Sequence, residues 1–366
     1  MRTVTVTLAA ALLAGCTGGS SGVTSTAGAG TPSPTSTSNP GTPRPRVGDA
    51  KVLTTKLRVP WGVAFLADGS ALVGERAGRV SHVSATGKRT TVGTVRGVSE
   101  DGEGGLLGLA ARQKGSATTL FAYYTSTSDD NRVVSMTYRG GRLGTQKVLL
   151  KGIASADHHN GGALAIGPDG DLWIGTGDAG NTARSQQRTN LNGKVLRITT
   201  SGKVPADNPF RGSPVYSYGH RNVQGIAFDS AGRTWATEFG QNTYDELNLI
   251  EKGANYGWPV VEGREGKKGY VDPKVQWPTS QASPSGLAIV DDVAYLGALR
   301  GERLWQVPLD GTAVGTPKSF FRNEFGRIRT VVAAPGGRLW LTTSNRDGRG
   351  SPVAADDRIL RVPLSS

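Results

Sequence analysis

The sequence is poor in cysteine and histidine, and it has no clear helical pattern. Cys16 is the only cysteine among 366 residues, so no intrachain disulfide can form and a disulfide-stapled fold is excluded. No stretch has an amphipathic helical period over about ten or more residues. Glycine, by contrast, occurs 53 times, which is more than a seventh of the chain. The composition disfavours a helical protein and favours a fold with many tight turns.

The N-terminus has the proportions of a secretory signal peptide. Arg2 precedes an apolar run from Val4 to Leu13, which is too short to span a bilayer as a permanent helix. Leu13-Ala14-Gly15-Cys16 then resembles the lipobox of bacterial lipoproteins, whose cysteine becomes the lipidated first residue. The alternative is an ordinary signal peptide that happens to contain a cysteine. We expect a signal peptide at residues 1–15 and lipidation of Cys16, which would hold the protein at the cell membrane outside the cytoplasm.

Residues 16–48 consist almost entirely of Gly, Ser, Thr, Pro and Ala. Such a segment buries too little apolar surface to offset the entropy of ordering, so we expect a flexible tether. Its Ser, Thr and Pro content would also suit O-glycosylation. A folded domain is expected over residues 49–366.

The net charge of +13 raises the question of nucleic-acid binding. However, the basic residues are scattered singly, with no basic run and no nucleic-acid motif. We therefore expect no nucleic-acid partner. A generally basic surface would instead suit anionic cell-envelope surfaces or acidic substrates.

One pattern recurs along the folded part: a glycine, a short apolar strand, a turn containing Asp-Gly or a close relative, and a second apolar strand. Copies begin at intervals of 44 to 63 residues, which leaves room for four short strands in each, the size of a propeller blade. Asp-Gly between apolar runs favours a hairpin whose two central residues both have positive φ. The sequence predicts an all-β, six-bladed β-propeller, with Lys51 to Leu57 closing the ring as an outer strand of the last blade. The copies begin at Gly62, Gly108, Gly162, Gly225, Gly286 and Thr330.

Histidine and arginine residues precede two of the repeats. His158 and His159 come just before Gly162, where propeller loops form a pocket, and a neutral imidazole there could accept a proton near neutral pH. A surface or turn histidine is the alternative. Arg221 holds the equivalent position before Gly225; it could stabilise an oxyanion or a carboxylate, or form an ion pair between blades.

Two other segments carry charge in a suggestive pattern. The stretch from Glu238 to Glu246 gathers acids around a glycine-containing turn, as a hard cation requires, although it lacks the spacing of an EF-hand. Arg327 and Arg329 alternate within an expected strand and therefore point to one face. Unless an acid or anion lies between them they repel each other; a polycarboxylate ligand or solvent would satisfy them.

The segment Gly175 to Gly180 matches the glycine pattern G-x-G-x-x-G of dinucleotide-binding folds. That fingerprint requires a following helix within a βαβ unit. Here a polar stretch follows inside an all-β repeat, so we reject a nicotinamide site.

Taken in order, these segments resemble the soluble quinoprotein glucose and aldose dehydrogenases, which use pyrroloquinoline quinone (PQQ) and calcium. The resemblance runs from about Trp61 to Val362. It implies a six-bladed propeller that oxidises an aldose at its anomeric carbon to the lactone and passes electrons to a further, unidentified acceptor. The motifs that carry it are Gly104-Gly105-Leu106-Leu107-Gly108, His159 with Gly162-Ala163-Leu164, Gly219-His220-Arg221-Asn222-Val223-Gln224-Gly225, Asp245-Glu246-Leu247-Asn248-Leu249-Ile250, Asn255-Tyr256-Gly257-Trp258-Pro259, Pro284-Ser285-Gly286-Leu287 and Arg327-Ile328-Arg329.

The resemblance also implies roles for single residues. His159 looks like the general base that takes the proton of the anomeric hydroxyl, with His158 and Glu103 beside the substrate. Arg221 resembles the arginine that stabilises negative charge on the quinone oxygen. The implied PQQ contacts are Asn222, Arg300, Arg327 and Arg329. Calcium at PQQ would take the backbone carbonyls of Gly240 and Gln241, and a second, structural calcium would take Glu246 and Tyr256.

Three positions depart from the family pattern. Glu103 stands where glutamine is common and adds a carboxylate near the substrate. Arg300 stands where a lysine usually contacts PQQ, which keeps the charge but not the geometry. Thr330 replaces an aspartate that usually follows the arginine pair, so the orientation of Arg329 is open.

Two other functions fit the same pattern. A noncatalytic propeller could bind a glycan or protein through the same pocket, because one fold hosts many functions. A calcium-dependent lactonase would also be a six-bladed propeller; it would hydrolyse lactones with metal and without quinone.

Overall fold

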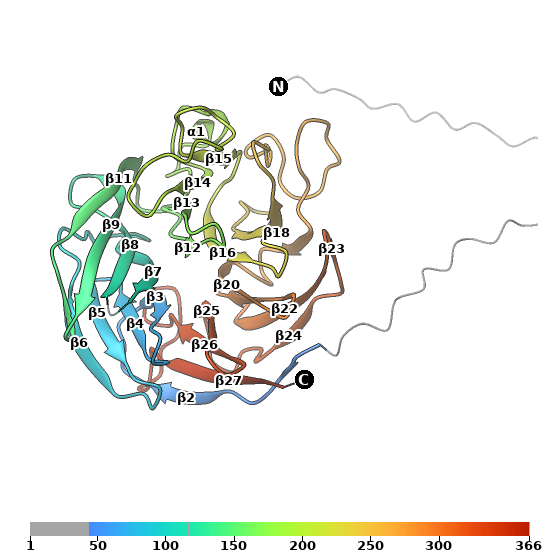
Figure 1. Ribbon diagram of the computed structural model, residues 1–366. Helices are drawn as coiled ribbons and strands as arrows, with labels where there is room; N and C mark the ends of the chain where they lie inside the picture. The colour runs from blue at the N-terminus through green and yellow to red at the C-terminus, as the bar shows by residue number, and fades with distance from the viewer. Residues whose placement is uncertain (1–43, 116, 366) are drawn as a thin grey trace, which may run out of the picture. The chain divides into compact units, whose positions relative to one another are not determined.

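The protein is a ring of six antiparallel sheets in a computed structural model that describes residues 44–115 and 117–365 (Figure 1). Each sheet is one blade, and the first strand of each blade lies nearest the centre of the ring. The predicted six-bladed β-propeller is therefore confirmed. The signal peptide at residues 1–15, the lipidated Cys16 and most of the tether lie outside the described residues.

The blades follow one another along the chain, and the last one also takes two strands from the beginning of the described chain. Blade 1 contains β3 (Pro60–Phe65), β4 (Ala71–Glu75), β5 (Arg79–Val83) and β6 (Arg89–Thr94). Blade 2 contains β7 (Leu106–Lys114), β8 (Ala117–Thr125), β9 (Asp130–Arg139), β10 (Arg142–Leu143) and β11 (Lys147–Ala154). Blade 3 contains β12 (Leu164–Ile166), β13 (Leu172–Gly175), the short α1 (Ala183–Gln186), β14 (Lys194–Ile198) and β15 (Val215–Tyr218). Blade 4 contains β16 (Val223–Phe228), β17 (Thr234–Glu238), β18 (Tyr244–Ile250) and β19 (Val275–Pro278). Blade 5 contains β20 (Pro284–Val290), β21 (Val293–Ala298), β22 (Arg303–Asp310), β23 (Ala313–Val314) and β24 (Lys318–Phe320). Blade 6 contains β25 (Ile328–Ala334), β26 (Arg338–Thr343), β27 (Ile359–Ser365), β1 (Arg46–Val47) and β2 (Lys51–Thr54).

The Asp-Gly turns join strands as predicted, but their backbone differs from the prediction. Gly69, between β3 and β4, has a φ of 81° and donates its N–H to Leu66 O at 3.1 Å. Gly170, between β12 and β13, has a φ of 80°, whereas the preceding aspartates stay at negative φ. The prediction that both central residues have positive φ was wrong. These loops are one residue longer than a two-residue turn, and in such loops only the last residue adopts the left-handed conformation.

The first strands approach one another so closely that a side chain would not fit at some positions. A Cβ added to Gly62 would lie 2.6 Å from Leu109 N in the next blade, and one added to Gly225 would lie 2.4 Å from Ser285 O. This packing explains the recurring glycine of the repeat. The six first strands enclose a central channel with a cavity of about 450 Å³.

The ring closes by pairing the two ends of the described chain. β2 runs antiparallel to β27, with Lys51 opposite Arg361, so the predicted closing strand is confirmed over its first part (Figure 1). β1 also pairs with β27, which places the start of the propeller before the expected boundary at residue 49. Leu57 and Asp357 then exchange two backbone hydrogen bonds of 3.0 and 3.1 Å. Blade 6 is therefore built from both ends of the domain.

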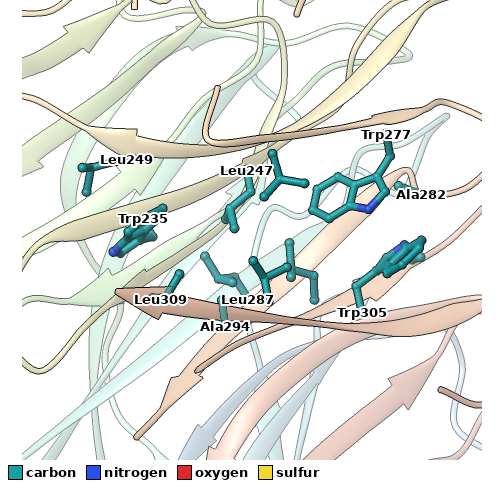
Figure 2. Close-up of a cluster of buried hydrophobic side chains, with 13 residues drawn as sticks. Trp235, Leu247, Leu249, Trp277, Ala282, Leu287, Ala294, Trp305 and Leu309 are labelled. Carbon is teal, nitrogen blue, oxygen red and sulfur yellow. The ribbon is translucent and has the colours of Figure 1, made fainter. Parts of the chain in front are cut away.

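Apolar side chains fill the spaces between neighbouring blades. The cluster between blades 4 and 5 contains Trp235, Leu247, Trp277 and Trp305, and the last two rings lie 5.6 Å apart (Figure 2). Burial of such large rings supplies much of the hydrophobic free energy that holds blades together. No helix within the described ranges is long and apolar enough to cross a membrane.

The carboxylate of Asp357 fastens the closing segment and generates a prediction about pH. It accepts the N–H of Val59 at 3.1 Å and that of Asn345 at 2.6 Å, and burial raises its pKa to about 6. The folded state therefore holds this proton more tightly than the unfolded chain, so the contribution of Asp357 to stability falls as the pH rises from about 4 to 6. Asp357→Asn removes this titration. The free energy of unfolding in urea should rise for the variant relative to the wild type as the pH increases from about 4 to 6. Above pH 6 the difference between the two proteins should stay constant. A difference independent of pH between 4 and 6 would contradict the expectation.

Candidate active site

Loops that precede the first strands meet at one end of the channel. Glu103 comes before β7, His159 before β12, Asn222 before β16, and Arg329 lies at the start of β25. Glu103 Oε2 accepts the backbone N–H of His159 at 2.9 Å, and Asn222 Oδ1 accepts that of Gly161 at 2.9 Å. The structure thus joins predicted site residues from neighbouring blades.

His159 has the surroundings of a general base. Its Nδ1 lies 2.7 Å from Asp178 Oδ1, and Asp178 Oδ2 accepts the indole N–H of Trp258 at 2.9 Å. Burial alone would raise the pKa of Asp178, but the hydrogen bonds and charge of these neighbours bring it below its usual value. The ionised carboxylate favours the proton on Nδ1 and leaves Nε2 free to accept one.

Sequence reasoning missed Asp178, although it lies in the segment that was tested for a dinucleotide fingerprint. The segment folds as a turn after β13, and Asp178 N–H donates to Arg221 O at 2.8 Å. His159 itself has a φ of 55°, a conformation that is uncommon outside glycine. The turn and this backbone geometry bring the imidazole against the carboxylate.

His158 lies beside His159 but in a different environment. The two rings meet edge to face with centroids 4.3 Å apart, and the His158 side chain is 43% exposed. Its Nδ1 hydrogen-bonds to Asp157, itself exposed to solvent. It lies next to the candidate base, and its contact with a substrate stays a prediction.

Arg221 and Asn222 are both buried. The Arg221 guanidinium donates to Gln241 Oε1 at 2.9 Å through Nε, and its backbone N–H donates to Glu238. The Nδ2 amide of Asn222 is buried and has no hydrogen-bond partner among the described residues. A buried donor without a partner is costly, so this amide is a natural place for a ligand acceptor.

Arg327 and Arg329 share an internal acid that the sequence analysis did not identify. Asp347 Oδ2 accepts hydrogen bonds from Arg327 at 3.1 Å and from Arg329 at 3.3 Å. Arg329 is fully enclosed, stacks on the ring of Trp61 at 4.0 Å, and has its pKa lowered to about 10 by burial. The two arginines therefore face one side as predicted, but a side chain of the protein already lies between them.

The orientation of Arg329, which the replacement at Thr330 left open, has a physical explanation. Arg329 Nε donates to Ser344 Oγ at 3.0 Å, so Ser344 and Asp347 hold the guanidinium. Thr330 Oγ1 donates to Trp61 O at 2.5 Å and so fixes the residue whose ring Arg329 covers. No aspartate is needed at position 330 for this arrangement.

A small cavity of about 20 Å³ lies among these groups. Arg76, which the sequence analysis also missed, lines it with a buried Nε that has no partner among the described residues. Arg300 is exposed, and its neighbour Leu299 lines the cavity instead, so a cofactor contact for Arg300 stays a prediction. The lining residues are Trp61, Arg76, Gly102, Glu103, Gln224, Phe239, Leu299, Arg329, Asp347 and Arg349.

The predicted calcium loop is held by a further acid, Glu262. Its Oε1 accepts the N–H groups of residues 241–244 at 2.7 to 3.3 Å, and these bonds bring its pKa below the usual value despite burial. Gly240 is required there, because an added Cβ would lie 1.7 Å from Tyr244 O. Within the described chain, the carbonyl oxygens of Gly240 and Gln241 accept no hydrogen bond. They are therefore open to a cation.

The second predicted calcium site is less complete. Burial, with the nearby charge of Glu238, raises the pKa of Glu246 well above its usual value. The Tyr256 hydroxyl donates to Leu249 O at 2.5 Å and accepts from Glu251 N–H, so the protein itself already occupies this hydroxyl. No group of three or more His, Cys, Asp or Glu side chains in the described ranges is arranged to hold a metal. Any cation here needs backbone oxygens as well.

The sequence and the fold of the chain are similar to those of known proteins. Residues 57–360 match the glucose/sorbosone dehydrogenase family. The chain belongs to that family. It is 28% identical over 344 residues to an aldose sugar dehydrogenase of Escherichia coli, covering 83% of this chain and 92% of that protein. It is 35% identical over 263 residues to quinoprotein glucose dehydrogenase B of Acinetobacter calcoaceticus, covering 61% and 54%.

A solved relative extends this likeness to the fold. The PQQ-bound form of an aldose sugar dehydrogenase from Streptomyces coelicolor is 48% identical, with a TM-score of 0.84, covering 88% of this chain and 100% of that one. Proteins named as sugar dehydrogenases are thus similar to this chain, and one of them has PQQ bound.

The shared acid between the two arginines leads to a prediction about stability. Asp347→Asn leaves two buried guanidinium groups without a charged partner and should lower the free energy of unfolding by about 3 to 5 kcal/mol. Asp310→Asn, at the exposed end of β22, removes the same charge and is the control. Denaturant unfolding of both variants measures the difference. A loss for Asp347→Asn no larger than that of the control would mean that the arginines do not depend on this carboxylate.

Proposed function

We propose that this protein oxidises an aldose at its anomeric carbon to the lactone, using PQQ as the hydride acceptor and calcium as a bound cation. The observation that carries the proposal is the His159–Asp178 pair, which a hydrogen bond from His159 N–H joins to Glu103 in the lining of an arginine-containing cavity. A base alone would suit many reactions. Its combination with buried guanidinium groups suits a reaction in which a proton and a hydride leave the sugar. The hydride acceptor would be a quinone whose carboxylates the guanidinium groups bind.

His159 acts as the base. Asp178 holds the ring through Nδ1, so Nε2 takes the proton of the anomeric hydroxyl. The imidazolium that forms is stabilised by the same carboxylate, which is itself fixed by Trp258 and by the N–H of Gly180 at 2.9 Å. PQQ, when bound, supplies an electrophilic quinone that accepts the hydride from the anomeric carbon.

The arginines and Asn222 hold the cofactor. Arg76 and Arg329 line a cavity in which a tricarboxylate would find charge-assisted hydrogen bonds, and Arg327 lies behind it on the shared carboxylate of Asp347. The unpartnered amide of Asn222 and the unpartnered Nε of Arg76 supply further donors. Arg221, fixed by Gln241, faces the same end of the ring and stabilises negative charge on a ligand oxygen. The residues present thus fit the chemistry of PQQ.

Calcium would take the free carbonyl oxygens of Gly240 and Gln241, since hard cations prefer oxygen ligands. Glu262 holds that loop through four N–H groups and thereby turns its carbonyls away from itself. A second cation near Glu246 would relieve the repulsion between this carboxylate and Glu238. We further propose that the protein works outside the cytoplasm, anchored through a lipid on Cys16.

Reconstitution tests the function directly. Purified protein is mixed with PQQ and calcium, and dye reduction and quinone absorbance are followed across a panel of aldoses. We expect saturable sugar oxidation that is lost when calcium is chelated and restored when it is added back. Absence of PQQ binding would contradict the proposal and favour a noncatalytic binding propeller, and lactone hydrolysis without quinone would favour a lactonase.

A single substitution tests the base. His159→Ala should leave PQQ binding nearly intact and lower kcat by about 10² to 10⁴-fold, because proton removal then depends on solvent. His82→Ala, in β5 and hydrogen-bonded to Ser70, is the histidine control. Single-turnover quinone reduction measures the chemical step in both. A near-normal rate for His159→Ala would exclude it as the base.

A further inference from the structure

One ion pair spans the mouth of the cavity and joins distant parts of the chain. Arg349 Nη1 lies 2.6 Å from Glu103 Oε1, and the two residues belong to the loop after β26 in blade 6 and to the loop before β7 in blade 2. Both side chains line the cavity of about 20 Å³. PQQ, with three fused rings, is far larger than that cavity, so lining side chains have to move before it can enter.

The contacts of Arg349 make it the lining arginine best able to move. Its side chain is 58% exposed, whereas Arg76 and Arg329 are buried. Its backbone N–H donates to Asp347 Oδ1 at 3.0 Å, so the loop is tied down while the long side chain reaches out to Glu103. Rotation about side-chain bonds is enough to release Glu103, and the loop need not shift. Because the Arg349 side chain is in contact with solvent, water can replace part of this ion pair when the guanidinium leaves.

Glu103 differs from Arg349 because it is held at a second point. Its other oxygen, Oε2, accepts the backbone N–H of His159 at 2.9 Å, and its side chain is only 15% exposed. When Arg349 leaves, Glu103 therefore stays beside the candidate base, with Oε1 available to a new donor. A sugar hydroxyl is such a donor.

Resting on the proposed function, we infer that Arg349 exchanges carboxylate partners during cofactor loading: it releases Glu103 and binds a carboxylate of PQQ. The inner acid Asp347 already holds Arg327 and Arg329, so Arg349 is the guanidinium whose present partner is most easily replaced. The exchange opens the mouth and at the same time frees one oxygen of Glu103 next to His159. Cofactor loading thereby prepares the place where the sugar binds, which makes binding ordered, with cofactor first.

The test is titration of the calcium-loaded protein with PQQ in the absence of sugar, followed by stopped-flow quenching of tryptophan fluorescence. Arg349→Ala should raise the Kd for PQQ about tenfold, since one charge-assisted contact is lost. Glu103→Gln removes the competing carboxylate and should raise the association rate constant about threefold or more. Arg349→Ala is thus expected to weaken PQQ binding, whereas Glu103→Gln is expected to speed it.

Matched controls separate this local exchange from the general effect of charge. Arg142→Ala, on the outer strand β10, and Asp310→Asn, at the end of β22, make the same charge changes at exposed positions. Both should bind PQQ as the wild type does. Thermal unfolding of each variant checks that the fold is kept.

The outcomes distinguish the inference from the proposed function. If the wild type binds PQQ and Arg349→Ala binds it equally well, or loses no more affinity than Arg142→Ala, the exchange is wrong while the function stands. Turnover of a uronic acid and of its neutral aldose is measured separately for Arg349→Ala. If only the ratio of these two turnover rates changes and PQQ binding does not, Arg349 binds a carboxylate of the substrate and the exchange is wrong. If the wild type binds no PQQ, the proposed function itself fails.

Discussion

The close approach of the six first strands around the channel is the constraint on which the rest of the protein depends. At Gly62 and Gly286 the backbone of the next blade occupies the space of a Cβ, with Leu109 N at 2.6 Å and Val331 N at 2.5 Å from that position. Because the strands lie so close, the loops before them are within hydrogen-bond reach of one another. Arg329 and Gln224 are 105 residues apart in sequence, yet their side chains are 3.5 Å apart. A binding site made from several blades follows from this geometry.

The positive charge near the mouth of the channel is difficult to explain by stability alone. Burying a guanidinium group costs several kcal/mol of desolvation, which an ion pair repays only in part. Arg329 is enclosed and shares one carboxylate with Arg327, while Arg76 has no carboxylate partner among the described residues. The excess of arginine over acid leaves positive charge that a polycarboxylate would neutralise. The stability of the fold therefore does not by itself account for this cluster of arginines.

The sequence allowed the architecture to be predicted because each blade repeats a local pattern. Glycines at strand starts, Asp-Gly turns and apolar runs all depend on residues near one another in the chain, and the closing strand followed from propeller logic. The resemblance also placed His159, Arg221 and the arginine pair at one end of the ring. Asp178, Asp347 and Glu262 could not be found in this way, since each acts on residues about 20 or more positions away. An aspartate in a turn has no local signal that identifies its partner.

The seam where the ring closes is also part of the site, and this links stability to function. Thr330 stands where the other blades have glycine, and its hydroxyl ties blade 6 to Trp61 of blade 1. Trp61 in turn carries the guanidinium of Arg329 on its ring. Strand pairing by β1 and β2, the carboxylate of Asp357, the hydroxyls of Thr330 and Thr342 and a cluster of apolar side chains hold the joint between these two blades. Opening of the seam would separate Arg329 from Trp61. A propeller that binds a ligand at this site must therefore keep the joint between blades 6 and 1 closed. A ligand held by both blades would in turn stabilise the closed ring, because it binds only the folded state.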